Sequence, residues 1–171
     1  MEKKKQTATM DERLNTLRAG VLGSNDGILT VVGVLFSVAV ATPNIFTIFI
    51  AGLSDLLACA FSMASGEYAS VSSQRDAESS SVEKERYLLK NDLAGEKKIV
   101  QEFYMSRGIT EETSKEIADE LIAKKPLETM VSIKYNIELN HYMNPWSAAF
   151  SSLFSAALGG LFPLLAMSLT S

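Results

Sequence analysis

Charged residues are confined to part of this 171-residue chain, and that partition limits the folds it can adopt. Between residues 19 and 74 the only charged side chains are those of Asp26, Asp55 and Glu67, and residues 142–171 carry none. A soluble domain places charge every few residues on its solvated faces, whereas a helix that crosses a bilayer needs about 20 mainly apolar residues. The partition therefore predicts membrane-spanning segments on either side of a polar segment.

Three apolar stretches have the length of a membrane helix: about 20–42, 43–66 and 146–171. The alternatives are a buried core helix or a signal peptide, but a signal peptide is followed by a soluble chain, and here two more apolar stretches follow. Pro43 and Asn44 separate the first two stretches without any charge, which predicts a tight antiparallel hairpin. The predicted fold class is all-α, an integral membrane protein with three transmembrane helices and a cytosolic helical domain between the second and third.

The predicted organisation has three parts. They are an N-terminal helix with a transmembrane hairpin at 1–74, a cytosolic three-helix domain at 75–141 and a third transmembrane helix at 142–171. Within the middle part we expect one helix from 75 to about 105 and a stop at 107–110. A second helix follows and ends before 124–126, and a last helix runs from Leu127 to about 139. Lys and Arg residues flank the outer ends of the hairpin and not its turn, so the positive-inside rule places the N-terminus and 75–141 in the cytosol.

Asp26 is a charged residue inside an apolar stretch, where a charge costs about 2.5–3.5 kcal/mol or more. It follows Asn25 and is flanked by Gly23 and Gly27, which let another helix approach closely or let the helix loosen. Asn and Asp side chains offer the oxygen ligands that divalent cations prefer. The alternative is that Asp26 lies near the cytosolic interface and stays solvated.

The second apolar stretch carries two stripes at a spacing of four residues. The first offers two carboxylates and two sulfur atoms, from Asp55, Cys59, Met63 and Glu67. On a helix this spacing forms one gently winding stripe, and its ligand types suit a passing transition-metal ion. The alternative is that the sulfur side chains only pack. The second stripe consists of small residues and predicts close helix packing: Ala58, Ser62, Gly66 and Ser70.

Several function classes are excluded by what the sequence lacks. A single histidine, His141, rules out His-rich metal sites and Ser/His/Asp triads, and the single cysteine, Cys59, rules out an intrachain disulfide. The balance is acidic, with no basic patch interleaved with aromatics, so no nucleic-acid partner is predicted. With no catalytic constellation, we predict neither an enzyme nor a bound cofactor.

Two signatures in the apolar stretches resemble those of a known family. Residues 23–28 (Gly-Ser-Asn-Asp-Gly-Ile) resemble the first-helix signature of the vacuolar iron transporter family, and residues 62–76 resemble its second-helix signature. Residues 103–109 and 118–121 are similar to its cytosolic three-helix domain, and residues 144–146 and 159–166 to its third membrane helix. The resemblance covers nearly the whole chain.

The resemblance implies exchange of cytosolic iron(II), and often manganese(II), for protons. It implies a homodimer in a lipid membrane, with the path between the first two helices of each subunit. The membrane would be the plasma or inner membrane in a prokaryote and the vacuolar membrane in a eukaryote. The positions that match the family's in-membrane metal site are Asp26 and Met63, with Glu67 nearby. Weaker candidates for the transport pathway are Asn25, Asp55 and Cys59.

The cytosolic metal site of the family uses two glutamate pairs, each three residues apart, and a Met-then-Glu pair. Glu85 and Glu96 match the first members of the glutamate pairs, whereas Leu88 and Ile99 stand at the second. The Met-then-Glu pair ends in Lys134, which would repel a divalent ion. The resemblance therefore implies that Glu85 and Glu96 are remnants of a cytosolic capture site.

Family members usually have five membrane helices, and this sequence stops after the third, which suggests a fragment or a truncated product. The predicted function is a divalent metal transporter subunit that exchanges iron(II) for protons, with another divalent ion as an open alternative. A second hypothesis is a non-transporting, membrane-anchored helical protein derived from a truncated metal transporter. It is motivated by Lys134 and the missing helices.

Overall fold

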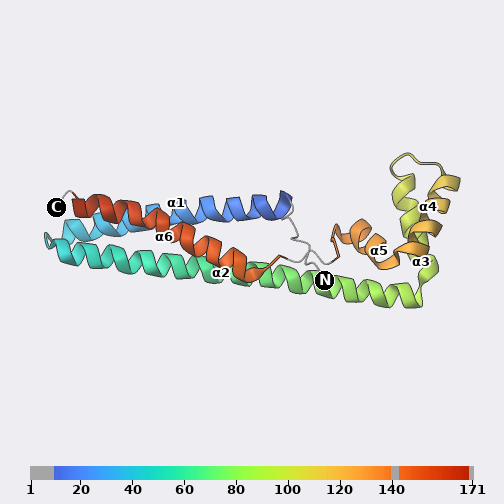
Figure 1. Cartoon of the computed structure of the whole chain (residues 1–171), viewed down its shortest axis with the longest axis horizontal. Helices are drawn as coiled ribbons and strands as arrows, with labels where there is room; N and C mark the ends of the chain where they lie inside the picture. Colours follow the sequence, from blue (N-terminus) through green and yellow to red (C-terminus); the bar gives the residue numbers. More distant parts are fainter. Residues whose placement is uncertain (1–9, 140–142, 170–171) are drawn as a thin grey trace, which may run out of the picture. The chain divides into compact units, whose positions relative to one another are not determined.

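The computed structural model describes residues 10–139 and 143–169, and every regular element within them is a helix (Figure 1). The all-α membrane fold predicted from the sequence is confirmed. Lys3, Lys4 and Lys5, which contributed to the predicted orientation, lie outside the described residues, as does His141. The helices are α1 (Met10–Ala41), α2 (Ile45–Asn91), α3 (Leu93–Met105), α4 (Glu111–Lys124), α5 (Pro126–Tyr135) and α6 (Pro145–Leu169).

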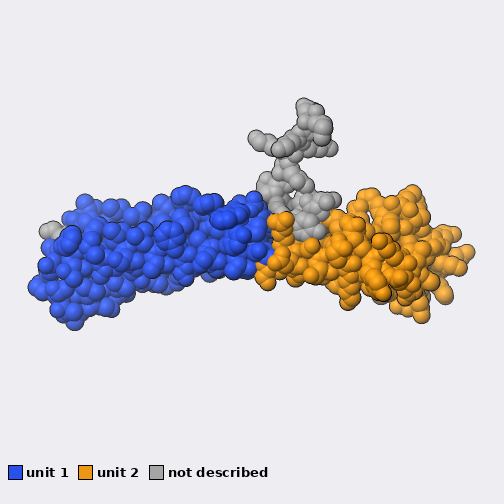
Figure 2. All heavy atoms as spheres, turned by 90° about the horizontal axis from the view of Figure 1, so that it is seen from below, with its two compact units in different colours: residues 1–72, 143–171 blue, residues 73–142 orange. Residues whose placement is uncertain are grey.

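The chain forms two compact units, coloured separately in Figure 2. The membrane unit comprises residues 1–72 and 143–171, and the charged unit comprises residues 73–142. Among the described residues, three helices are long and apolar enough to cross a membrane: α2, α6 and the part of α1 from Thr16.

The hairpin predicted between the first two spans is present, because α1 ends at Ala41 and α2 begins at Ile45. The side-chain oxygen of Asn44 accepts a hydrogen bond from the Thr47 amide at 3.1 Å and so caps the start of α2. The third span begins one residue before the predicted stretch, with Pro145 in the first turn of α6.

Helices α1 and α6 approach so closely that their contact is built on glycine. A Cβ at Gly27 would lie 2.3 Å from the carbonyl oxygen of Ala156, and one at Gly159 would lie 2.2 Å from that of Ser24. The Ser24 hydroxyl donates to the Ser155 carbonyl oxygen at 3.1 Å across the same contact. The close approach predicted at the Gly23–Gly27 segment is therefore confirmed, and its partner is the third span.

The small-residue stripe of α2 does not take part in close packing among the described helices. Ala58, Ser62, Gly66 and Ser70 are all exposed, and a Cβ at Gly66 would meet no described atom within 4 Å. The helix instead joins the membrane unit through larger side chains. The buried apolar core there combines residues of α1, α2 and α6: Val31, Leu35, Ile48, Leu56 and Leu164.

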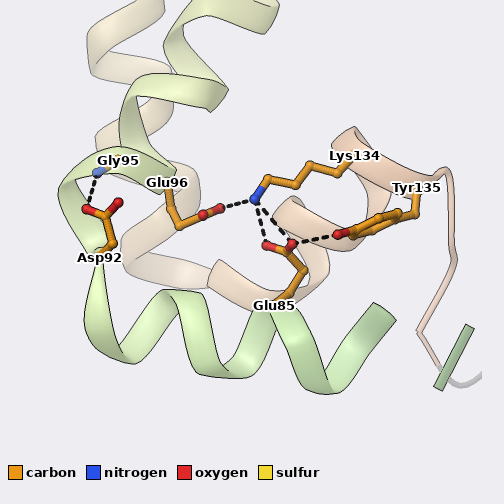
Figure 3. A network of polar contacts seen from close by, with 6 residues as sticks. All are labelled: Glu85, Asp92, Gly95, Glu96, Lys134 and Tyr135. Carbon is orange, nitrogen blue, oxygen red and sulfur yellow. Dashed lines mark hydrogen bonds and ion pairs between the residues drawn. The ribbon is translucent and has the colours of Figure 1, made fainter. Parts of the chain in front are cut away.

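Helix α2 continues past the apolar stretch to Asn91, so the predicted helix from 75 to about 105 was wrong as a single element. The break comes at Asp92, whose carboxylate accepts from the Gly95 amide at 2.9 Å and caps α3 (Figure 3). The residues just before the break, 82–91, include no proline or glycine. The available signal was Asp92 itself, because Asp is a favoured residue immediately before a helix.

The charged unit packs α3, α4 and α5 around a small apolar core of Val100, Ala118, Ile122 and Met130. Helix α5 ends at Tyr135, before the predicted end near 139. Asn136 ends it by adopting the left-handed conformation, with φ of 55°. Asn tolerates this conformation better than most residues, which makes it a common helix terminator.

Candidate functional site

Asp26 of α1 and Cys59 of α2 meet inside the membrane unit. The Cys59 thiol donates a hydrogen bond to Asp26 Oδ2, with a sulfur–oxygen distance of 3.5 Å. Thr30 lies one turn beyond Asp26, and Asp55 lies one turn before Cys59. Because α1 and α2 are antiparallel, both residues come to lie beside the thiol. Two spans thus contribute two carboxylates, a thiol and a hydroxyl to one polar cluster.

This polar cluster lies near mid-span. At 1.5 Å per residue, Asp26 is roughly 15 Å along α1 from Thr16, where the apolar part of that helix begins. Asp55 is roughly 15 Å along α2 from Ile45. Asp26 therefore lies within the apolar part of α1 and not at its end.

Two oxygen atoms of the cluster are buried without a hydrogen-bond partner among the described residues, Thr30 Oγ1 and Asp55 Oδ2. An unpaired buried oxygen costs about 1–3 kcal/mol, and more when it is charged. A proton or a cation would relieve that cost. Within the described residues, however, no three Asp, Glu, Cys or His side chains lie close enough together to hold a metal ion.

The other predicted pathway residues extend from this cluster. Met63 and Glu67 follow Cys59 by one and two helical turns, and both are half-buried, like Asp55 and Cys59. Asn25 is exposed. The side chain hydrogen-bonded to Asp26 is that of Cys59. From the sequence alone, Cys59 is a weaker candidate than Met63.

The polar cluster is open on the side where Asp26 lies. Asp26 is exposed, so the cluster lies at an open edge of the three helices. Two apolar grooves of about 390 and 570 Å³ do lie against α6, but the described residues that line them include no carboxylate. These grooves therefore have no part in the candidate site.

A second polar cluster lies in the charged unit, where Lys134 of α5 points between two carboxylates (Figure 3). Lys134 Nζ is 2.9 and 3.2 Å from the two oxygens of Glu85 on α2, and 2.6 Å from Glu96 Oε2 on α3. The Tyr135 hydroxyl donates to Glu85 Oε1 at 2.9 Å. The structure thus brings together the two predicted glutamates, and an ammonium lies between them.

The surroundings keep Lys134 charged and Tyr135 neutral. Burial lowers the pKa of the Lys134 ammonium, but Glu96 and Glu85 outweigh it, so the pKa lies above its ordinary value of 10.5. Burial raises the pKa of the Tyr135 hydroxyl, and the neighbouring Glu85 carboxylate raises it further. Both side chains therefore act as hydrogen-bond donors toward the glutamates at physiological pH.

A family model described as the VIT family matches residues 17–171 of this chain. The chain belongs to the VIT family. The match includes both membrane signatures and the segments of the charged unit on which the resemblance to vacuolar iron transporters rested.

Curated relatives of this VIT-family chain come from an amoeba and from plants. It is 38% identical over 87% of its length to "Vacuolar iron transporter" of Acanthamoeba castellanii, covering 54% of that protein. It is 30% identical over 90% of its length to "Vacuolar iron transporter homolog 2" of Oryza sativa, covering 59%. Against "Vacuolar iron transporter homolog 2.1" of Arabidopsis thaliana the identity is 29% over 90%, covering 54%. The chain thus spans little more than half the length of these relatives.

Two contacts in the polar clusters of the VIT-family chain were not predicted from its sequence. Thr30 lies one turn from Asp26 on the same helix face, and that spacing was the signal that could have placed it in the membrane cluster. The contact of Lys134 with Glu85 and Glu96 had no such signal, because it joins residues far apart in the sequence. Only the repulsion of a divalent ion by Lys134 could be foreseen.

Proposed function

We propose that this VIT-family chain is a subunit of a divalent metal transporter that exchanges iron(II), or manganese(II), for protons across a membrane. The names of its relatives support iron as the transported ion. The observation that carries the proposal is the meeting of Asp26 and Cys59 from two spans, beside a carboxylate oxygen of Asp55 that is buried without a partner.

In this proposal Asp26 is the main ligand and Met63 is a second ligand on the opposite helix. Glu67 serves as a second carboxylate or as a proton carrier. A membrane carboxylate binds a cation when ionised and loses it when protonated, so metal and proton compete for one site. Cys59 and Asp55 extend the pathway, because a thiol adds preference for softer transition metals and a carboxylate adds charge.

The proposal includes a homodimer, as the family resemblance implies. Asp26 is exposed on the single chain, and a charged side chain facing hydrocarbon is costly. Protein from outside this chain, or water, must therefore cover the open edge where Asp26 lies. The proposed orientation places the N-terminus and residues 75–141 in the cytosol.

The test is iron(II) flux into proteoliposomes under an imposed pH gradient. We expect Asp26→Ala to lower the flux at least tenfold, because it removes the carboxylate for which metal and proton compete. Ser54→Ala is the matched control, since Ser54 is exposed in the same membrane unit and its hydroxyl donates to the Ile50 carbonyl oxygen at 2.8 Å. Equal flux from the wild type and Asp26→Ala would refute the assignment.

A second candidate function is that of a membrane-anchored helical protein that transports nothing. The observation in its favour is Lys134, which fills the space between Glu85 and Glu96 in the charged unit. Absence of flux from folded wild-type protein under both gradient directions, with either metal, would favour this candidate. Proton-coupled flux from the wild type would end it.

A further inference from the structure

The centre of the charged unit holds two buried carboxylates from different helices. Glu85 is 0% exposed and Glu96 is 3% exposed, and Lys134 contacts both (Figure 3). Carboxylates withdrawn from water need a compensating cation and hydrogen bonds. In this chain the cation is itself a side chain of the protein, carried by α5.

The ammonium of Lys134 is fully used by these partners. It has three N–H donors, and three carboxylate oxygens lie within hydrogen-bonding distance of Nζ: both of Glu85 and one of Glu96. Tyr135 supplies a further donor to Glu85. The three donors of the ammonium are therefore all used without any added ion, and its charge offsets one of the two carboxylate charges.

The same space does not fit a metal ion while the amine is present. A divalent ion binds carboxylate oxygens at about 2.0–2.6 Å, so an ion shared by Glu85 and Glu96 would have to stand where Nζ stands. The nearby thioether of Met130 is 0% exposed and packs in the apolar core. No group of three Asp, Glu, Cys or His side chains suited to a metal occurs in the described parts of the chain.

We propose that Lys134 is a tethered cation that takes the place of a metal ion in the charged unit. The unit folds without metal because the Lys134 ammonium, carried by α5, bridges Glu85 of α2 and Glu96 of α3 and offsets one of their two charges. Loss of the amine opens a divalent-cation site formed by Glu85, Glu96 and the Tyr135 hydroxyl. This concerns the charged unit alone and holds whether or not the membrane unit transports metal.

The first test counts bound ions on the full chain in detergent, with Mn²⁺ as the probe because it suits oxygen ligands. Lys134→Met keeps a side chain of similar length and removes the charge. We expect it to bind one more Mn²⁺ per chain than the wild type in equilibrium dialysis. Lys134→Arg keeps the positive charge and should gain none. The double variant Lys134→Met with Glu85→Gln should lose the extra ion.

Equal Mn²⁺ counts for the wild type and Lys134→Met would overturn the proposal. Should Lys134→Met unfold in a chelator, we expect Mn²⁺ to restore its fold. A variant that stays unfolded at saturating Mn²⁺ would overturn the proposal as well.

A second measurement uses only the wild type and reads the charged unit locally. Amide hydrogen exchange in α3 and α5, followed by mass spectrometry, should be the same in a chelator and in saturating Mn²⁺. Because the signal comes from these helices, metal bound in the membrane unit does not contribute to it. Protection of α3 and α5 that rises with Mn²⁺ would mean that the unit takes metal with the amine in place, contrary to the proposal.

Discussion

At the scale of single residues, the two polar clusters of this chain differ in how their charges are balanced. In the charged unit Glu85 and Glu96 share the ammonium of Lys134, and both oxygens of Glu85 are hydrogen-bonded to it. In the membrane unit Asp26 receives only a weak thiol donor, and Asp55 keeps a buried oxygen without a partner among the described residues. A cluster whose carboxylates contact no cationic side chain is the better site for an ion that must both bind and leave.

Asp55 gives a prediction at this scale. We expect Asp55→Asn to lower proton-coupled iron(II) flux about tenfold, because the neutral amide removes a charge from the pathway. The same change should leave the melting temperature in detergent unchanged or higher, since it removes the cost of a buried unpaired charge. A purely structural role would give the reverse pattern, with lower stability and unaltered flux per folded molecule.

At the scale of elements, the contact between α1 and α6 depends on the absence of side chains. Gly27 and Gly159 face backbone atoms of the other helix at distances that no Cβ could occupy. Lipid chains are as apolar as the helix surfaces, so association in a membrane depends on close packing of this kind. The contact also orients α1, and thereby the Asp26 carboxylate one residue before Gly27.

Gly27→Ala tests this contact against a matched glycine of the same helix. The added methyl group would lie 2.3 Å from the Ala156 carbonyl oxygen, whereas at Gly33 it would meet no described atom within 4 Å. We expect Gly27→Ala to destabilise the membrane unit by about 1–3 kcal/mol, the usual cost of overpacking. Gly33→Ala should be neutral or slightly stabilising, because alanine favours helix. Reversible unfolding in mixed detergent micelles would measure both, and equal stabilities would contradict the packing argument.

The elements show where sequence reasoning succeeds and where it stops. The three spans, the hairpin and the start of α6 could be predicted because each follows from a local run of apolar or turn-forming residues. The break at Asp92 was missed because a single capping residue interrupts an otherwise helical run. Two contacts join residues that are far apart in the sequence and so could not be predicted from local patterns. They are the packing of Gly27 against α6 and the position of Lys134 between two glutamates.

At the scale of the whole molecule, α2 belongs to both compact units as one continuous helix. Its first part is apolar enough to cross a membrane, and its last part carries Glu85 of the charged unit. The proposed orientation therefore requires the two ends of α2 to lie on opposite sides of the bilayer.

Cysteine labelling in vesicles tests that orientation, in a Cys59→Ala background that leaves no native thiol. Asn44 and Lys84 are both exposed, one just before α2 and one near its far end. We expect a membrane-impermeant maleimide to label Lys84→Cys from the cytosolic side only and Asn44→Cys from the opposite side only. Labelling of both from one side would disprove the crossing.

The ammonium between Glu85 and Glu96 has a consequence for what the charged unit can sense. Because the ammonium is covalently part of the chain, its presence does not depend on the concentration of metal in the cell. Another metal ion cannot exchange with it. A unit that holds such a cation keeps the same fold whether metal is scarce or abundant. On the proposal that Lys134 replaces a metal ion, the fold of the charged unit does not respond to the metal supply.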